Sequence, residues 1–468
     1  MGAHRELSAR GARFLNLASL LAVVAAGATP WSAPAVLSTC AAGAAAQVVF
    51  PSDSPSHATG AGAIVWGAAP GCPGGEGARV AAIGAGDQPG APAIPRTAAH
   101  RPIAPHGPLL AGGAPHGQIV IAGAAPGAAT QGLLIQGAAA GPFTALAPAG
   151  GSATPAGGSA APTALATAYL GDVALASAPE RAGAGSTRGF DLRVERFFSH
   201  EFTRDLTVRV AAGAGLVRAL TLAMDYRSEV LAAWVQGGAI YARLVPEHGA
   251  AGPLQRLAPA GARPHIAALL SDDRRAIVAW SEQHGAQTSV YIDRSGTGVR
   301  FRAPQLLESF ADPDGLPAPA ASPSLVRLSS ESVMLAWAGS AAGHWVVRTA
   351  PVYLNGVGTV GTIAAREADA MLADLTAGPA ADALVLWTEP SPSALGQPDM
   401  DSQAIFAARG FDAGQERTVF DPPEQVAPPA PVLGLSAAFD PSSDRAVAVW
   451  QGEADAIEYS VRTGAAAP

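Results

Sequence analysis

The sequence predicts an all-β fold: a single closed β-propeller of seven or eight four-stranded blades, preceded by a signal peptide. Three observations predict it. A short apolar run that ends in Trp recurs about every 55 residues. Strand-like runs and Gly-bearing turns follow most copies in the same order. Gly and Pro, 54 and 40 of the 468 residues, interrupt the chain too often for helices of ten or more residues.

The N-terminus predicts export. Residues 1–13 carry three Arg and one acid, and residues 14–28 are apolar apart from Asn16 and Ser19. A basic segment before an apolar core of this length is typical of a secretory signal, and the core is too short to span a membrane comfortably. We expect cleavage after Ala28 or after Ala46, which makes residues 1–46 the signal and a short leader. The mature protein is then secreted or held in the cell envelope, with no membrane span.

The site of cleavage decides whether both cysteines, Cys40 and Cys72, remain in the mature protein. If it follows Ala28, both remain and an oxidising compartment allows one disulfide. If it follows Ala46, Cys72 is alone. A lipid-anchoring site at Cys40 fits poorly, because Thr39 is bulkier than the residue expected before such a Cys. Neither Cys has a partner at zinc-ligand spacing.

The repeated elements set the blade count. The Trp-terminated run occurs six times, at 63–66, 230–234, 276–280, 333–337, 383–387 and 446–450, and weaker copies without Trp stand at 119–122 and 173–176. A further strand-like run follows most copies, at 239–243, 289–292, 345–348, 404–408 and 457–461. Eight copies argue for eight blades, or for seven if one weaker copy is not a blade. We expect the Trp side chains to pack as wedges between blades, since each ends a buried strand.

Two stretches decide the limits of the propeller. Residues 67–165 are rich in Gly, Ala and Pro and could be a linker, but 141–150 nearly repeats 252–261 in phase, so we assign them to blades. The last strand, 457–461, has no fourth strand after it. Residues 47–50 could supply that outer strand and close the ring. The propeller is therefore predicted over 47–463, with 464–468 a disordered tail.

Composition excludes several classes of function. The net charge is −8, only 14% of the residues are charged, and all 29 basic residues are Arg. A basic nucleic-acid-binding surface is not expected from this balance. A phosphate-binding loop of the Gly-Lys type is impossible without Lys.

The order of the repeated elements resembles that of secreted bacterial propeller-repeat proteins of the sialidase-like superfamily. Residues 291–301 resemble a degenerate Asp-box turn around Asp293, although the preceding Ser is out of register and the final Trp is replaced. The resemblance implies the propeller fold. A sialidase would also need three Arg on the substrate carboxylate, a Tyr–Glu nucleophile pair and an acid/base Asp.

Two segments are candidates for parts of such a site. Phe301-Arg302-Ala303-Pro304 resembles an Arg-bearing sialidase motif, but it lies in mid-chain, where Phe-x-x-Pro is the fourth strand of the repeat. Glu458 and Tyr459 could form the nucleophile pair, but adjacent residues on a strand point to opposite faces. We interpret both segments as structural.

Polar clusters elsewhere have equally ordinary interpretations. His100, His106 and His116 lie in a Pro- and Gly-rich loop with nothing to fix zinc geometry. Residues 312–315, Asp-Pro-Asp-Gly, resemble the start of a calcium loop but lack its later ligands, so they predict a turn. Residues 272–275, Asp-Asp-Arg-Arg, predict a hairpin tip with local charge pairing. The sequence therefore assigns no catalytic, cofactor-binding or metal-binding residue.

Two functional hypotheses remain. The favoured one is a non-enzymatic extracellular module, expected to be monomeric, that binds an unknown glycan or protein without a cofactor. The alternative is a sialidase-type glycoside hydrolase acting on extracellular glycans. The hydrolase needs several Arg and a pair of carboxyl groups at one channel mouth, with the pKa of one carboxyl raised.

Overall fold

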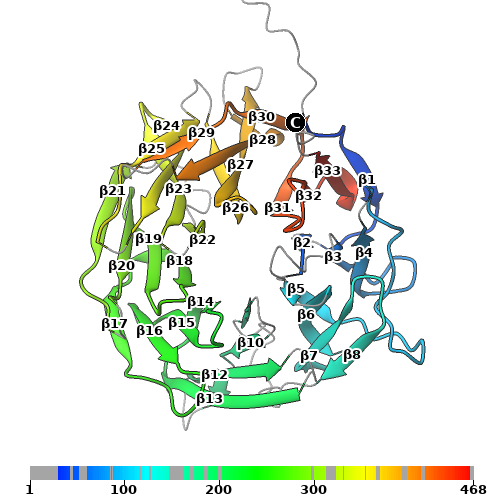
Figure 1. Cartoon of the computed structure of the whole chain (residues 1–468), viewed down its shortest axis with the longest axis horizontal. Coiled ribbons are helices and arrows are strands. Elements are labelled where there is room, and N and C mark those ends of the chain that lie inside the picture. The colour runs from blue at the N-terminus through cyan, green and yellow to red at the C-terminus, as the bar shows by residue number, and fades with distance from the viewer. Residues whose placement is uncertain are drawn as a thin grey trace, which may run out of the picture.

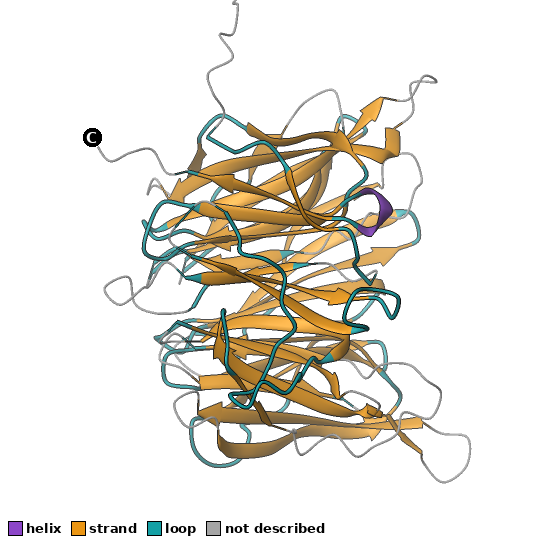
Figure 2. Cartoon of the chain, turned by 90° about the vertical axis from the view of Figure 1, so that its right-hand side faces the viewer, coloured by secondary structure: helices purple, strands orange, loops and turns teal. Residues whose placement is uncertain are grey.

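The computed structural model is an eight-bladed β-propeller, which confirms the predicted fold class. Figure 1 shows the ring of blades, and Figure 2 shows from the side that strands make up nearly all of it. The model describes residues 30–42, 46–51, 61–84, 86, 88–114, 117–125, 128–146, 163–168, 172–178, 180–182, 188–198, 203–296, 300–311, 323–329, 331–353, 355–364, 369–392, 398–412 and 417–463. No helix in these ranges is long and apolar enough to cross a membrane.

Each blade is an antiparallel sheet whose strands run outwards from the centre of the ring in chain order. Blade 1 consists of β2 (Gln47–Val49), β3 (Gly62–Ala68) and β4 (Gly77–Ile83), and blade 2 of β5 (His106–Ala114), β6 (Gln118–Ala125), β7 (Ala128–Ala138) and β8 (Phe143–Leu146). Blade 3 consists of β9 (Thr163–Thr167), β10 (Asp172–Ser177), β12 (Arg188–Phe198) and β13 (Thr203–Ala214), and β11 (Glu180–Ala182) also pairs with β12. Blade 4 consists of β14 (Val217–Met224), β15 (Val230–Gln236), β16 (Ala239–Val245) and β17 (Gln255–Pro259).

The other four blades follow the same plan, and the last one is completed by the N-terminal segment. They are blade 5, β18 (Ala262–Leu270), β19 (Ala276–His284), β20 (Gln287–Arg294) and β21 (Gln305–Ala311); blade 6, β22 (Ser324–Arg327), β23 (Val333–Ala341), β24 (His344–Val352) and β25 (Gly361–Ala364); blade 7, β26 (Met371–Ala377), β27 (Asp382–Pro392) and β28 (Pro398–Asp412), with β29 (Thr418–Phe420) and β30 (Glu424–Ala430) both against β28; and blade 8, β31 (Leu433–Phe439), β32 (Ala446–Gln451), β33 (Ile457–Arg462) and β1 (Ala35–Ser38). A 3₁₀ turn, η2 (Glu453–Asp455), precedes β33.

The Trp-terminated runs form the second strand of their blades, where a strand on either side and a blade on either face bury them. Trp234, Trp280, Trp337 and Trp387 are fully buried and Trp450 is 1% exposed, as predicted. Both copies that lack Trp are also second strands, β6 and β10, so the seven-blade alternative is wrong. Their Val and Ile side chains fill the same inter-blade space.

The residue opposite each Trp on the third strand varies from blade to blade. Tyr241, Tyr291 and Phe406 stack on Trp234, Trp280 and Trp387, with ring centroids 5.7, 5.5 and 6.0 Å apart. In the remaining Trp-bearing blades this partner is charged. It is Arg79 opposite Trp66, Arg348 opposite Trp337 and Glu458 opposite Trp450.

The ring closes between the two ends of the chain, but through a different strand from the one expected. Residues 47–50 were predicted to be the outer strand of the last blade. Instead 47–49 form β2, the innermost strand of blade 1, and β1 pairs with β33. The short connection from 49 to 62 allows β2 and β3 to form a hairpin, which leaves the more distant β1 free to reach blade 8.

Residues 67–165, which could have been a linker, contribute to blades wherever they are described. They supply β4, the whole of blade 2 and the start of β9. Residues 89–93 take the outer position of blade 1 through bridges from Val80 to Ala93 and from Ile83 to Pro89. The stretch 147–162 lies outside the described residues.

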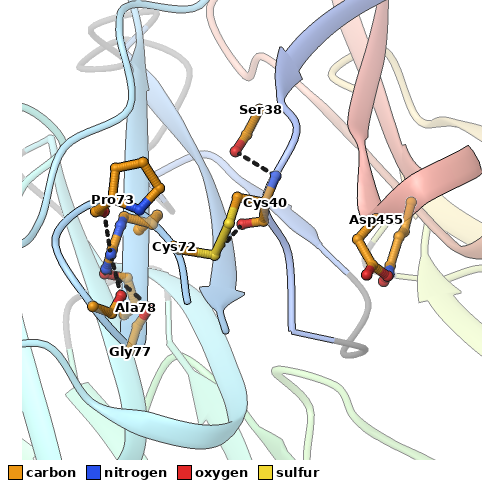
Figure 3. Close-up of a disulfide and its surroundings, with 10 residues drawn as sticks. Ser38, Cys40, Cys72, Pro73, Gly77, Ala78 and Asp455 are labelled. Carbon is orange, nitrogen blue, oxygen red and sulfur yellow. Dashed lines mark hydrogen bonds between the residues drawn. A yellow bond between two sulfur atoms is a disulfide. The ribbon is translucent and has the colours of Figure 1, made fainter. Parts of the chain in front are cut away.

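A disulfide joins Cys40 to Cys72, with their Cα atoms 5.7 Å apart (Figure 3). Cys40 follows β1 of blade 8, and Cys72 lies in the connection between β3 and β4 of blade 1. The disulfide therefore fastens the closing strand to the neighbouring blade. At the opposite end of β33, Trp31 bridges to Arg462, is buried, and donates its indole N–H to Glu424 at 3.0 Å.

Candidate functional site

The connection between the first and second strands is a repeated tight turn. In six blades the N–H of its first residue donates to the carbonyl of its last, at 2.8–3.2 Å, in the pairs Ala168–Asp172, Asp225–Glu229, Ser271–Arg275, Leu328–Ser332, Gly378–Asp382 and Asp440–Arg445. First strands lie nearest the centre of the ring (Figure 1). Because alternate strands are antiparallel, all these turns lie at the same mouth of the central channel.

Asp225 shapes the turn of blade 4. Its Oδ1 accepts the backbone N–H of Arg227 at 3.0 Å and that of Glu229 at 2.9 Å. Ser228 takes the left-handed conformation, with φ of 62°. Asp is favoured at the first position of such turns because its short side chain bonds the backbone two or more residues on.

Charged side chains connect the turns of neighbouring blades. Arg274 of blade 5 donates its Nε–H to Glu229 of blade 4 at 2.6 Å. Arg327, at the end of β22 in blade 6, forms an ion pair with Asp272 of blade 5. The N–H of Tyr226 donates to the same Asp272 at 3.4 Å. The channel mouth at blades 4–6 thus has a continuous polar rim.

A cavity of about 350 Å³ lies inside this rim. Inner strands of blades 3–5 supply its mostly apolar wall, and polar side chains from the turns and β22 line its mouth. The lining residues are Ala166, Thr167, Leu222, Ala223, Met224, Asp225, Tyr226, Ala268, Leu269, Leu270, Asp272 and Arg327. We call this the channel-mouth cavity. A concave apolar site with a few convergent polar groups is the usual form of a small-ligand site.

Asp225 is the most unusual group in the channel-mouth cavity. Only 2% of it is exposed, and its Oδ2 is buried with no hydrogen-bond partner among the described residues. Burial raises the pKa of Asp225 to about 6, and the nearby charge of Glu229 adds to that rise. The carboxyl is therefore mostly ionised at neutral pH and mostly protonated near pH 5, where it can donate a hydrogen bond.

Three arginines near this mouth, Arg274, Arg327 and Arg227, each have a partner. Arg274 is held by Glu229 and Arg327 by Asp272. Arg227 donates to the Tyr226 hydroxyl at 2.7 Å, and its guanidinium lies over that ring at 5.1 Å. The described residues contain no group of three or more His, Cys, Asp or Glu placed to hold a metal ion.

Residues 272–275 form the hairpin tip expected from the sequence, but their charge pairing is only partly local. Asp273 and Arg275 pair within the turn at 2.6 Å. Asp272 and Arg274 reach instead to the blades on either side. A hairpin read from sequence alone cannot reveal such pairs, because their partners are about 45–55 residues away.

The segments that resemble sialidase motifs do not line the channel-mouth cavity. Asp293 is the second-last residue of β20, and its Oδ1 accepts the N–H of Arg294 at 2.7 Å and of Arg302 at 3.2 Å. Arg302 itself is exposed. Glu458 accepts the indole N–H of Trp450 at 3.1 Å, and the Tyr459 hydroxyl donates to Gln88. These contacts belong to turns and inter-strand packing.

The candidate metal ligands are not brought together by any described contact. His100 is exposed in the loop before blade 2, and His106 begins β5 with its side chain outside the described part. His116 and residues 312–315 also lie outside the described residues.

Sequence reasoning missed Asp225, Tyr226 and Arg327. One signal was available for the first. Asp225, Ser271 and Asp440 each head the turn before a Trp-terminated strand, and Asp or Ser at that position caps a tight turn. Nothing in the sequence marks Arg327, which ends its strand and meets Asp272 only through the packing of blades 5 and 6.

The chain matches no protein-family model and no curated protein. Solved structures that it resembles include the lectin of Aleuria aurantia, a six-bladed propeller, at 12% identity over 70% of this chain and 96% of the lectin, with a TM-score of 0.36. A neuraminidase-like protein of A/flat-faced bat/Peru is 10% identical over 65% of this chain and 88% of that one, with a TM-score of 0.34. A prolyl endopeptidase is 14% identical over 69% of this chain but only 44% of its own length, with a TM-score of 0.37. At these values the similarity concerns the propeller fold alone.

Proposed function

We propose that this protein is an exported β-propeller that binds a ligand in the channel-mouth cavity of blades 3–6 without catalysing a reaction. The observation that supports it most is the carboxyl of Asp225, which lines this cavity and whose buried Oδ2 has no hydrogen-bond partner among the described residues. An unmatched buried acceptor is costly unless a ligand supplies its donor. The ligand chemistry that fits is an uncharged or cationic group with hydroxyl or amine donors, as on a neutral glycan or a protein side chain.

The pairing of the arginines favours binding over sialidase chemistry. A sialidase clamps the carboxylate of its substrate with arginines that are free to converge on it. Here Arg274 and Arg327 are neutralised by Glu229 and Asp272, and Arg227 is held on Tyr226. An anionic sugar would have to displace those partners or meet the charge of Asp225.

The hydrolase remains the second candidate because of one observation. Asp225, with its pKa raised to about 6, lies in one cavity with Asp272. Glycoside cleavage by general acid catalysis uses a carboxyl group with a raised pKa together with a second carboxyl group.

A glycan array and a fluorogenic sialoside assay, run on the same preparation, separate the two functions. We expect glycan or protein binding without turnover, and at least a tenfold loss of affinity in Asp225→Ala. Asp374→Asn is the matched control, because Asp374 has an equally raised pKa but does not line the channel-mouth cavity. Turnover that Asp225→Ala abolishes and Asp374→Asn retains would establish the hydrolase instead.

Export is part of the proposal. The basic and apolar N-terminal segments indicate a signal peptide, and the Cys40–Cys72 disulfide supports an oxidising compartment. Because β1 and Cys40 belong to the folded ring, we propose cleavage after Ala28 rather than Ala46. N-terminal sequencing of the mature protein tests this, and an intact Met1 on cytosolic protein would contradict it.

A further inference from the structure

A second cavity, of about 550 Å³, lies beside the disulfide and away from the channel-mouth cavity. The end of β1, the β3–β4 hairpin of blade 1 and the segment 92–96 enclose it. Its lining residues are Ser38, Thr39, Cys40, Trp66, Cys72, Pro73, Arg79, Pro92, Ala93, Ile94 and Arg96. We call it the clasp cavity.

Two guanidinium groups and an indole N–H line the clasp cavity, and none of them has an acidic partner among the described residues. The Nε1 of Trp66 is buried and has no acceptor among the described residues. Arg79, directly across from Trp66, donates from its Nη atoms only to backbone carbonyls, those of Pro73, Gly75, Gly77 and Ala78 (Figure 3). Arg96, exposed at the rim, donates to the carbonyl of His100 at 2.9 Å. Within the described residues neither guanidinium meets a carboxylate.

Blade 6 shows what the same arrangement holds when it is complete. There Arg348 stands across from Trp337 in the register that Arg79 has to Trp66. The carboxylate of Glu308 accepts the Trp337 indole N–H at 2.7 Å with one oxygen and the Arg348 Nε–H at 3.2 Å with the other. Trp387 and Trp450 also donate to carboxylates, at 2.9 and 3.1 Å. Blade 1 has the same pair in Trp66 and Arg79, but the clasp cavity lies beside them where Glu308 lies beside the pair in blade 6.

We propose that the clasp cavity binds a small carboxylate ligand, whose carboxylate takes the place that Glu308 has in blade 6. One ligand oxygen accepts the Trp66 indole N–H. The other approaches the Nε of Arg79, which none of the four carbonyl bonds uses, and Arg96 covers the charge from the rim. Exposed Thr39 and the volume of the cavity suit a ligand that carries hydroxyl groups, such as a uronic acid.

The test uses the full-length mature protein with ¹⁵N-labelled tryptophan and sodium glucuronate as probe. The Trp66 indole signal is identified by its loss in Trp66→Phe, which keeps an aromatic ring. We expect that signal to shift downfield and saturate with glucuronate, because its N–H gains a charged acceptor. Glucose, which lacks the carboxylate, should leave it in place.

Calorimetry with variants completes the test. Glucuronate affinity should fall at least tenfold in Trp66→Phe and in Arg96→Gln, and the latter changes only an exposed side chain. Trp280→Phe is the matched control, because it also removes a buried indole N–H without an acceptor but in a blade away from this cavity. Equal shifts with glucose, equal affinity for sulfate, or an equal loss in Trp280→Phe would each overturn the proposal. The channel-mouth proposal is unaffected by any of these outcomes.

Discussion

At the scale of single residues, two aspartates have unusual pKa values: the buried Asp225 and the half-buried Asp374. The pKa of each is raised to about 6, chiefly by burial. Asp374, on the inner strand β26, accepts the N–H of Ala437 on β31 at 2.7 Å and so connects the inner strands of blades 7 and 8. Asp225 makes no such inter-blade bond through its Oδ2. Asp374 therefore connects two blades, whereas the Oδ2 of Asp225 connects none among the described residues.

The raised pKa values predict a pH-dependent stability. The folded state holds these protons more tightly than the unfolded chain, where the pKa is about 3.9. This stabilisation is therefore complete below about pH 4 and is lost as the pH rises through about 6. The parent loses stability between pH 5 and pH 7.5 as these carboxyl groups ionise. In Asp225→Asn and in Asp374→Asn, that loss should each time be smaller by about 1 kcal/mol. Urea unfolding at the two pH values measures this.

The comparison must be made between variant and parent, because other groups titrate in the same range. Burial lowers the pKa of His265, so its contribution has the opposite sign and is lost as the pH falls. That contribution is common to all the chains and cancels in the difference. An unchanged pH dependence in both Asn variants would show that neither carboxyl holds its proton as described.

At the scale of elements, β1 is the part on which closure of the ring depends. It covers the outer edge of β33, and the disulfide fastens it to blade 1. Without β1, the N–H and C=O groups of β33 would face solvent and could pair with another chain.

The disulfide should stabilise the ring by closing a loop in the unfolded chain. With the cysteines 32 positions apart in the sequence, the chain-entropy contribution is about 3–4 kcal/mol. We expect a paired Cys40→Ser and Cys72→Ser variant to unfold at lower urea concentration by that amount, and the parent to match it in reductant. A chain that begins at residue 47 should lose more, because β1 is lost as well. Equal stability of the truncated and the Cys-free chains would contradict the role of β1.

The second strands were predictable from sequence because each appears as a continuous apolar run within a few residues. A strand flanked in its own sheet and covered on both faces must be apolar throughout, and Val230–Trp234 shows this without any knowledge of its neighbours. The third strands were predictable because each follows its second strand after a short, similar number of residues. By contrast β1 has the short sequence Ala-Val-Leu-Ser within a region that also suits a leader, so its role was invisible. The channel-mouth cavity was equally hidden, because Asp225, Asp272 and Arg327 come from three blades and meet only when the ring forms.

At the scale of the whole molecule, the two ends of the described chain meet. The N–H of Thr463 donates to the carbonyl of Pro30 at 3.0 Å, and Ser32 bonds to Val461. This contact allows a circular permutant in which residue 463 is joined to residue 30 and the chain is opened between residues 42 and 46. Blade 8 would then be continuous in sequence, and every blade contact would be retained.

The permutant changes only the loop that the disulfide closes. That loop would grow from 32 residues to roughly 400, so reduction should cost about 2 kcal/mol more in the permutant than in the parent. Urea unfolding with and without reductant measures the difference. If reduction costs the same in both chains, the disulfide does not act through loop closure.

The clasp between β1 and blade 1 also has a consequence for the order of events in synthesis. If the protein is exported N-terminus first, as proposed, Cys40 and Cys72 reach the oxidising compartment early and can pair before blades 2–7 have arrived. The disulfide then holds β1 beside blade 1, at the place where β33 of the last blade must pair with it. A chain cut short at any later blade leaves β1 without β33 and exposes an apolar sheet face at each end of the arc. Completion of blade 8 pairs β1 and covers both faces, so the fold itself distinguishes a finished chain from an interrupted one.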